Sequence, residues 1–121
     1  MLELNEREKT STKRILKEND NKVDVMKEYS ESGVLMWEIS HINGKRHAVS
    51  KWYYDSGALD WETPYVNGKI HGVRKYYSET DVLKWETPYV NGKIHGDEKY
   101  YSESGKLLRT IEYKNDEIVS K

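Results

Sequence analysis

One stretch of twelve residues occurs twice in this chain without a change, and this repetition limits the possible folds more than any other feature. Residues 61–72 read Trp-Glu-Thr-Pro-Tyr-Val-Asn-Gly-Lys-Ile-His-Gly and recur as residues 85–96, at an offset of 24. The same offset places Trp37 in one column with Trp61 and Trp85. A fixed period of this length is typical of repeat proteins, in which each unit buries its apolar face against the next. The sequence therefore predicts an array of about four 24-residue repeats over residues 29–121.

Each repeat carries two turn signals. Asn-Gly at positions 43–44, 67–68 and 91–92 favours a type I′ hairpin turn, because both residue types accept a positive φ. The Ser-Gly segments at Gly33, Gly57 and Gly105 favour a second turn with left-handed backbone. Between the turns, residues 82–90 alternate apolar and polar side chains, as half-buried strands do. The predicted fold is all-β: an elongated, single-sheet antiparallel β-meander of successive hairpins.

Residues 1–28 form a charged segment ahead of the array. Asn19-Asp20-Asn21 falls in the column of the Asn-Gly turns, which favours a degenerate first repeat. A short charged helix acting as a cap fits the same stretch. Both interpretations stay open.

Composition excludes several classes of protein. The 121 residues contain 20 Lys+Arg and 21 Asp+Glu, so no basic excess favours nucleic acid. The chain has no Cys, which removes disulfides, thiol nucleophiles and cysteine-ligated metals. No apolar run is long enough for a membrane helix or a secretory signal, and we expect a cytoplasmic protein.

Folding the hairpin about Asn91-Gly92 predicts which residues face each other. An unbroken ladder pairs Tyr89 with Ile94, Thr87 with Gly96, Trp85 with Glu98 and Leu83 with Tyr100. Gly72 and Gly96 would then leave room for a neighbouring ring. Pro64 and Pro88 conflict with such a ladder because they lack an N–H. Either a bulge at Thr-Pro, which would turn Trp61 and Trp85 to the other face, or a longer turn is needed.

Polar residues recur on the face opposite the aromatic one, and none of them forms a catalytic or metal-binding pattern. Equivalent histidines would lie two strands apart, roughly 10 Å, too far to share one zinc ion. The glutamates repeat by translation, whereas an active site is asymmetric. We therefore expect a protein that is not an enzyme and has no cofactor or metal. The residues predicted for this face are Lys27, Lys51, Lys75, Lys99, Glu38, Glu62, Glu86, His47, His71 and His95.

Two sets of side chains are candidates for binding. Trp and Tyr dominate protein interfaces, and a one-layer sheet leaves part of each ring uncovered, although the simpler interpretation is that the rings form the core of the array. A lysine stripe, joined by Lys84 and interrupted by Asp60, could meet an acidic surface, although the adjacent glutamates would balance it. The candidate partner-binding residues are Trp37, Trp61, Trp85, Tyr65, Tyr89, Tyr76 and Tyr100, and the candidate headgroup-binding residues are Lys51, Lys75 and Lys99.

The motifs Tyr-x-Glu-Ser-Gly-x-Leu, Trp-Glu-Thr-Pro-Tyr-x-Asn-Gly-Lys-x-His-Gly and Lys-Tyr-Tyr make residues 29–114 similar to the bacterial variant of the MORN repeat. The resemblance implies a sheet of successive hairpins and an antitoxin-like protein or an interaction module. More typical MORN repeats are associated with scaffolding and acidic phospholipids. This chain departs from the pattern at Asp81, Ala48, Arg109 and Asp116.

The leading hypothesis is a non-enzymatic protein-binding module, antitoxin- or immunity-like, whose partner would be a toxin. The alternatives are anionic phospholipid binding through the lysines, and cell-wall glycan or choline binding. Exposed sheet edges also allow a homodimer.

Overall fold

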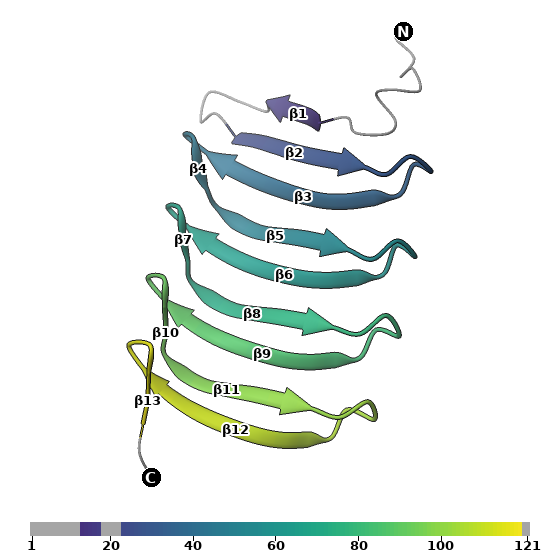
Figure 1. Cartoon of the computed structure of the whole chain (residues 1–121). Helices are drawn as coiled ribbons and strands as arrows, with labels where there is room; N and C mark the ends of the chain where they lie inside the picture. Colours follow the sequence, from purple (N-terminus) through teal and green to yellow (C-terminus); the bar gives the residue numbers. More distant parts are fainter. Residues whose placement is uncertain (1–12, 18–22, 120–121) are drawn as a thin grey trace, which may run out of the picture.

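The computed structural model describes residues 13–17 and 23–119, which form one antiparallel sheet of thirteen strands. The long strands lie side by side in chain order, and short strands form an arm along one border of the sheet (Figure 1). Within the described residues no segment is helical. The predicted all-β, single-sheet meander of hairpin repeats is confirmed.

Each full repeat contains three strands. A long strand runs to the Asn-Gly turn, a two-residue arm strand follows it, and a return strand leads to the Ser-Gly turn. The long strands are β3 (Leu35–Ile42), β6 (Leu59–Val66), β9 (Leu83–Val90) and β12 (Leu107–Lys114). The arm strands are β4 (Lys45–Arg46), β7 (Lys69–Ile70), β10 (Lys93–Ile94) and β13 (Glu117–Ile118), and the return strands are β5 (Ala48–Tyr53), β8 (Gly72–Tyr77) and β11 (Gly96–Tyr101).

Two strands precede the first full repeat. β1 (Lys13–Lys17) pairs with β2 (Val23–Tyr29), and β2 pairs with β3. They occupy part of the segment for which the sequence left a degenerate repeat and a charged helix open. The sequence Asn19-Asp20-Asn21 lies outside the described residues.

Both turn predictions are correct. Asn67 and Gly68 have φ of 51° and 86°, as a type I′ turn requires. At the second turn, Gly33, Gly57 and Gly105 all have positive φ, and Asp81 takes the same conformation with φ of 69° in the repeat that lacks the glycine.

The predicted pairing of the hairpin is correct only next to the turn. Ile94 faces Tyr89, after which the ladder breaks and resumes with Lys99 opposite Glu86 and Tyr100 opposite Trp85. The expected pairs Thr87–Gly96, Trp85–Glu98 and Leu83–Tyr100 are therefore wrong, because the return strand is shifted by two residues. The break lies on the return side, while β9 continues unbroken through Thr87 and Pro88. A shift of two residues preserves the alternation of faces, so the tryptophans keep their predicted face.

Proline and glycine meet at the break in the two central hairpins. The carbonyl of Pro88 accepts a hydrogen bond from the His95 N–H at 3.0 Å, but Pro88 has no N–H with which to continue the ladder. Gly96 follows with φ of 118°, and a Cβ on it would lie 3.0 Å from Pro88 Cγ. Pro64 and Gly72 repeat this arrangement. The ring for which these glycines leave room is thus a proline of the same hairpin.

The first hairpin breaks with the same two-residue shift, because His41 faces Arg46 and Trp37 faces Trp52, although it has neither proline nor glycine at these positions. Ser40 stands in the proline position and accepts the equivalent bond from the His47 N–H at 3.0 Å. Ala48, with φ of 68°, occupies the glycine position. A residue with a Cβ is found where the proline ring is missing.

We predict that Gly72→Ala lowers the free energy of unfolding by about 2 kcal/mol, because it combines positive φ with a contact of 3.0 Å to Pro64 Cγ. Adding Pro64→Ser should recover part of that loss. Ala48→Gly is the matched control and should change stability by less than about 1 kcal/mol, since relieved strain and added unfolded-state entropy oppose each other. Urea unfolding of these three variants, of Pro64→Ser alone and of the unmodified chain measures these effects, and an equal cost of Gly72→Ala with and without Pro64 would contradict the steric explanation.

Candidate functional site

An uninterrupted row of aromatic side chains crosses the sheet. Cross-strand pairing joins Trp37 to Trp52, Trp52 to Trp61, Trp61 to Tyr76, Tyr76 to Trp85 and Trp85 to Tyr100, and the row ends at Arg109. We call these six rings the aromatic ladder. The two-residue shift after each arm strand creates it, because in the last of these hairpins that shift places Trp85 opposite Tyr100 instead of Glu98.

The rings contact each other along the middle of the ladder. Tyr76 stacks on Trp85 with ring centroids 4.4 Å apart, and Trp61 meets Tyr76 at 4.7 Å and Trp85 at 5.6 Å. Such pairs contribute about 0.5–1.5 kcal/mol each beyond their buried area. All six rings are nevertheless only half-buried. The ladder therefore both stabilises the sheet and remains accessible.

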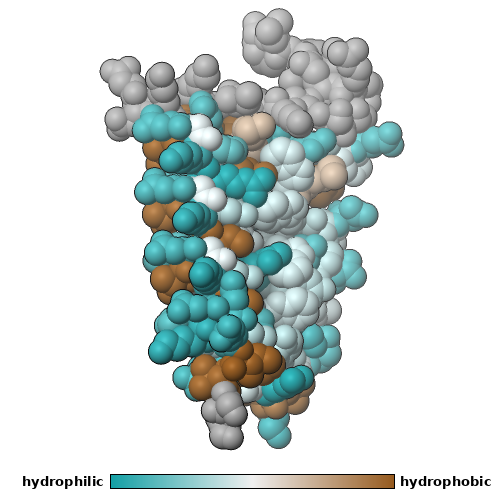
Figure 2. Space-filling view, turned by 60° about the vertical axis from the view of Figure 1, so that its left-hand side comes forward, coloured by the Kyte–Doolittle hydropathy of each residue, from teal (hydrophilic) through white to brown (hydrophobic). Residues whose placement is uncertain are grey.

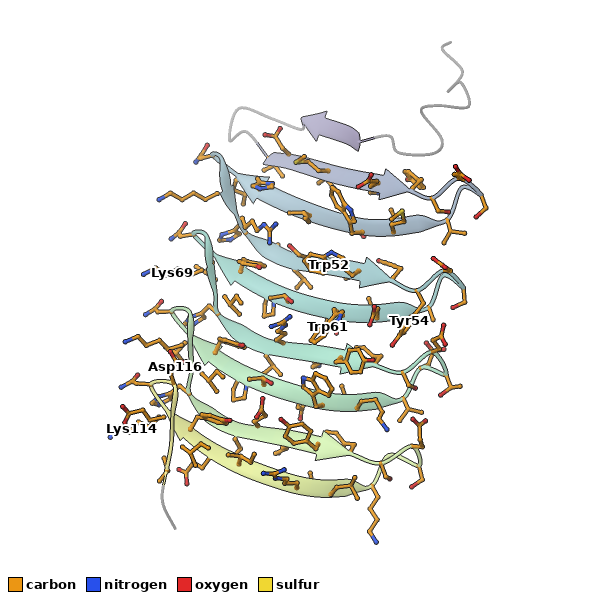
Figure 3. All side chains as sticks on the ribbon, viewed as in Figure 1. Trp52, Tyr54, Trp61, Lys69, Lys114 and Asp116 are labelled. Carbon is orange, nitrogen blue, oxygen red and sulfur yellow. The ribbon has the colours of Figure 1, made fainter. Side chains whose placement is uncertain are left out.

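Figure 2 shows a pale band of side chains of intermediate hydropathy, the range into which Trp and Tyr fall, beside hydrophobic and hydrophilic patches that alternate along one border. In Figure 3, Trp52 on β5 and Trp61 on β6 lie near each other in the middle of the sheet.

The structure divides the predicted partner-binding residues between two rows. Trp37, Trp61, Trp85, Tyr76 and Tyr100 belong to the aromatic ladder. Tyr65 and Tyr89 lie in a separate row nearer the arm, opposite Ile70 and Ile94. Sequence reasoning missed Trp52, although the 24-residue offset aligns it with Tyr76 and Tyr100.

Between these two rows lies the most buried part of the sheet, and it is largely polar. Ser50, Thr63, Thr87 and Glu98 are 0%, 3%, 4% and 8% exposed, whereas Ile39, at 8%, is the buried apolar side chain among the described residues. Glu98 accepts hydrogen bonds from Thr87 Oγ1 at 2.7 Å and from the Tyr100 hydroxyl at 3.1 Å. A single sheet has no second layer to cover this polar row, so the flanking rings cover it instead.

A cleft of about 360 Å³ opens on the same face over β5, β6 and β8. Arg46 and Arg74 line it together with Trp52, Trp61, Tyr65 and Ile70. The Arg74 guanidinium carbon lies 4.3 Å from the Trp61 ring centroid, and that of Arg46 lies 5.2 Å from the Tyr65 centroid. We call this site the arginine cleft. Sequence reasoning did not identify either arginine, since neither belongs to a repeating column.

The candidate headgroup-binding lysines lie on the opposite face, as expected, but they do not form a lysine stripe. Lys51 faces Glu38 and Glu62, Lys75 faces Glu62 and Glu86, and Lys99 faces Glu86 and Thr110. Lys84 does not join them, because it is the extra residue of a bulge and pairs with Glu103 at 3.0 Å. Charges of both signs thus alternate across this face.

Tyrosine hydroxyls hold the carboxylates of this row. Tyr53 donates to Glu38 at 3.3 Å, Tyr77 to Glu62 at 3.0 Å and Tyr101 to Glu86 at 2.9 Å. Burial, followed by the hydrogen bond to Glu62, raises the pKa of Tyr77 to about 12. Burial and the neighbouring glutamates also raise the pKa of Tyr53 and that of Tyr101.

The three aligned histidines connect successive repeats. The Nδ1 atoms of His47, His71 and His95 each accept a hydrogen bond from the backbone N–H of the asparagine in the next turn, at 3.4, 3.1 and 3.4 Å. The N–H of the residue after this asparagine, Gly68, Gly92 or Asp116, donates at 2.8 Å to a carbonyl of the preceding arm strand. These histidines therefore have a structural role in stacking the turns.

The family described as MORN repeat variant matches the chain at two repeats, residues 46–67 and 94–115. Each matched segment starts on an arm strand and ends within the following turn, and the two lie two repeat lengths apart. MORN repeats are generally associated with protein binding or membrane-lipid binding. No curated protein and no solved structure matches the chain. Across residues 13–17 and 23–119, no helix has the length and apolar character needed to cross a bilayer.

We predict that stability falls as the pH rises above 10.0, the ordinary pKa of tyrosine, through about 12, the raised pKa of Tyr77. The sign follows from the direction of the shift: a raised pKa in the folded state stabilises it below pH 10.0, and this contribution is lost as Tyr77 ionises. Denaturant unfolding at a series of alkaline pH values should show the decline. Tyr77→Phe should make it shallower, whereas parallel curves for the two proteins would contradict the assignment.

Proposed function

We propose that this protein is a non-enzymatic protein-binding module whose partner lies along the aromatic ladder. The observation that carries the proposal is that six rings lie in one row and are only partly buried, and that four of them, Trp61, Tyr76, Trp85 and Tyr100, contact one another. Trp and Tyr lose little conformational entropy when they are buried at an interface, and they are enriched among the residues that dominate binding energy. A pre-ordered row of such rings reduces the ordering cost of association.

The repeated character of the face supports binding in preference to catalysis. Equivalent residues follow one another at each repeat, and the buried carboxylate on this face, Glu98, is already held by Thr87 and Tyr100. Such a surface offers extended contact, not one reactive centre. An antitoxin- or immunity-like role, which the sequence resemblance implies, would make the partner a toxin.

Lipid binding through Lys51, Lys75 and Lys99 is the alternative with less support. Glutamates lie between the lysines on both sides, so an anionic membrane would meet charges of both signs. Attraction of a polybasic segment to a membrane amounts to about 1 kcal/mol per Lys or Arg, and the adjacent glutamates offset it.

Affinity capture from cells that express the tagged protein at its natural level tests the proposal. We expect one stoichiometric protein with the unmodified chain and its loss with Trp61→Ala/Trp85→Ala, because truncating two central rings should weaken binding at least about tenfold each. A matched surface control, Lys51→Glu/Lys75→Glu/Lys99→Glu, should retain the partner.

A second variant, Trp52→Ala, tests the proposal even if Trp61→Ala/Trp85→Ala does not fold. Trp61 and Trp85 contact other rings closely, whereas Trp52 forms no ring pair among the described residues, so Trp52→Ala should preserve the sheet. Circular dichroism establishes which variants fold. Undiminished capture by folded Trp61→Ala/Trp85→Ala and by folded Trp52→Ala would refute binding through the aromatic ladder. Loss of the partner only in the triple lysine variant would favour binding through the opposite face.

A further inference from the structure

The arginine cleft contains two positive charges from different repeats. Arg46 comes from the arm strand β4, and Arg74 comes from the return strand β8. Both side chains are half-buried and line one cavity of about 360 Å³. The sequence places Ile70 and Ile94 at the positions equivalent to Arg46, and Ser50 and Glu98 at those equivalent to Arg74. The pair therefore occurs once in the array.

Aromatic rings hold both guanidinium groups in place. Arg74 lies over Trp61 at 4.3 Å, while Arg46 lies over Tyr65 and donates from Nη1 to the Tyr65 hydroxyl at 3.0 Å. A guanidinium held over a ring keeps N–H donors for an anion, and Arg46 uses one of its Nη1 donors for Tyr65. The rings thus orient the two arginines in advance.

The donors of these arginines lack an acidic acceptor within the described residues. The ion pair found among the described residues joins Lys84 to Glu103 and involves neither arginine. The Nε atom of Arg74 is buried from solvent and has no hydrogen-bond partner. The carboxylate of Glu98, in the same buried row, is held by Thr87 and Tyr100. An anion in the cleft would therefore meet the Nη donors of the two arginines, and no carboxylate of the described residues competes for them.

We propose that the arginine cleft binds a carboxylate, the acidic side chain of a partner protein that lies along the aromatic ladder. This inference rests on the proposed function and specifies the chemistry of its partner. The apolar walls formed by Trp52 and Ile70 suit the methylene groups of a glutamate, and the two guanidinium groups suit its charge. A lipid phosphate fits less well, since the lysines that would support a membrane contact point to the opposite face.

Nuclear magnetic resonance of the folded, ¹⁵N-labelled full chain tests the proposal with N-acetylglutamate N-methylamide as the probe. The side-chain N–H signals of Arg46 and Arg74 should shift and saturate with this probe. They should not shift with N-acetylglutamine N-methylamide, which has the same shape without the charge. No saturable shift at concentrations of tens of millimolar would overturn the proposal, as would equal shifts with both probes.

Substitutions assign the binding to the cleft. Arg74→Gln should raise the dissociation constant of the glutamate probe at least about tenfold, and Arg46→Gln gives a second test if the first variant unfolds. Arg109→Gln is the matched control, because Arg109 also lies over a ring, Tyr100, at 5.9 Å, but outside the cleft. Equal affinity in Arg74→Gln and the unmodified chain would overturn the assignment.

Two further results separate this inference from the proposed function. In sedimentation with vesicles that contain phosphatidylinositol phosphates, we expect no vesicle binding that depends on Arg74. Vesicle binding that is lost in Arg74→Gln would assign the cleft to lipid instead. If Trp61→Ala/Trp85→Ala loses the captured protein while Arg74→Gln retains it undiminished, the protein-binding module stands and the carboxylate site fails.

Discussion

A break after the arm strand, marked by the positive φ of Ala48, Gly72 or Gly96, determines how the hairpins of this sheet are paired. The Pro88 carbonyl accepts one hydrogen bond from His95, and the ladder then stops. Gly96 continues the chain with a positive φ, and a Cβ at this position would lie too close to the Pro88 ring. The return strand then re-enters two residues further along. Both faces depend on this step, since it aligns the rings on one side and places each central lysine opposite glutamates on the other. With an unbroken ladder, Trp85 would face a carboxylate.

The resulting sheet is stable without a second layer because its two outer rows cover a polar middle. Threonine, serine and glutamate occupy positions where a sandwich would bury aliphatic side chains. Hydrogen bonds such as Thr87–Glu98 satisfy part of this row, and the half-buried rings of the aromatic ladder cover it. Rings that cover a row from one side keep an outer surface in solvent. Fold stability and accessible binding surface therefore have the same origin.

The turns and the strand faces could be predicted from the sequence, because their signals are local and recur in each repeat. Asn-Gly determines a type I′ turn through the positive φ of two adjacent residues, and the alternation in residues 82–90 determines the faces of β9. Counting outward from that turn failed beyond Ile94, because it assumes a continuous ladder. The break has no single residue signal, since the hairpin with Ser40 and Ala48 carries the same two-residue shift as the one with Pro88 and Gly96. Trp52 was missed because the search followed identical residues, whereas the ladder requires only that each position carry a ring.

The arginine cleft was invisible to the same approach for a more general reason. A repeat search finds positions that agree, and in an array the agreeing positions build a uniform surface. Recognition of a single partner in a single register requires positions that differ. The buried row supplies them: the equivalent positions Ser50, Arg74 and Glu98 are neutral, positive and negative, at intervals of two strands or about 10 Å. A partner that slid along the ladder by one repeat would keep its contacts with the rings but meet a different charge, so the residues that break the pattern determine the register.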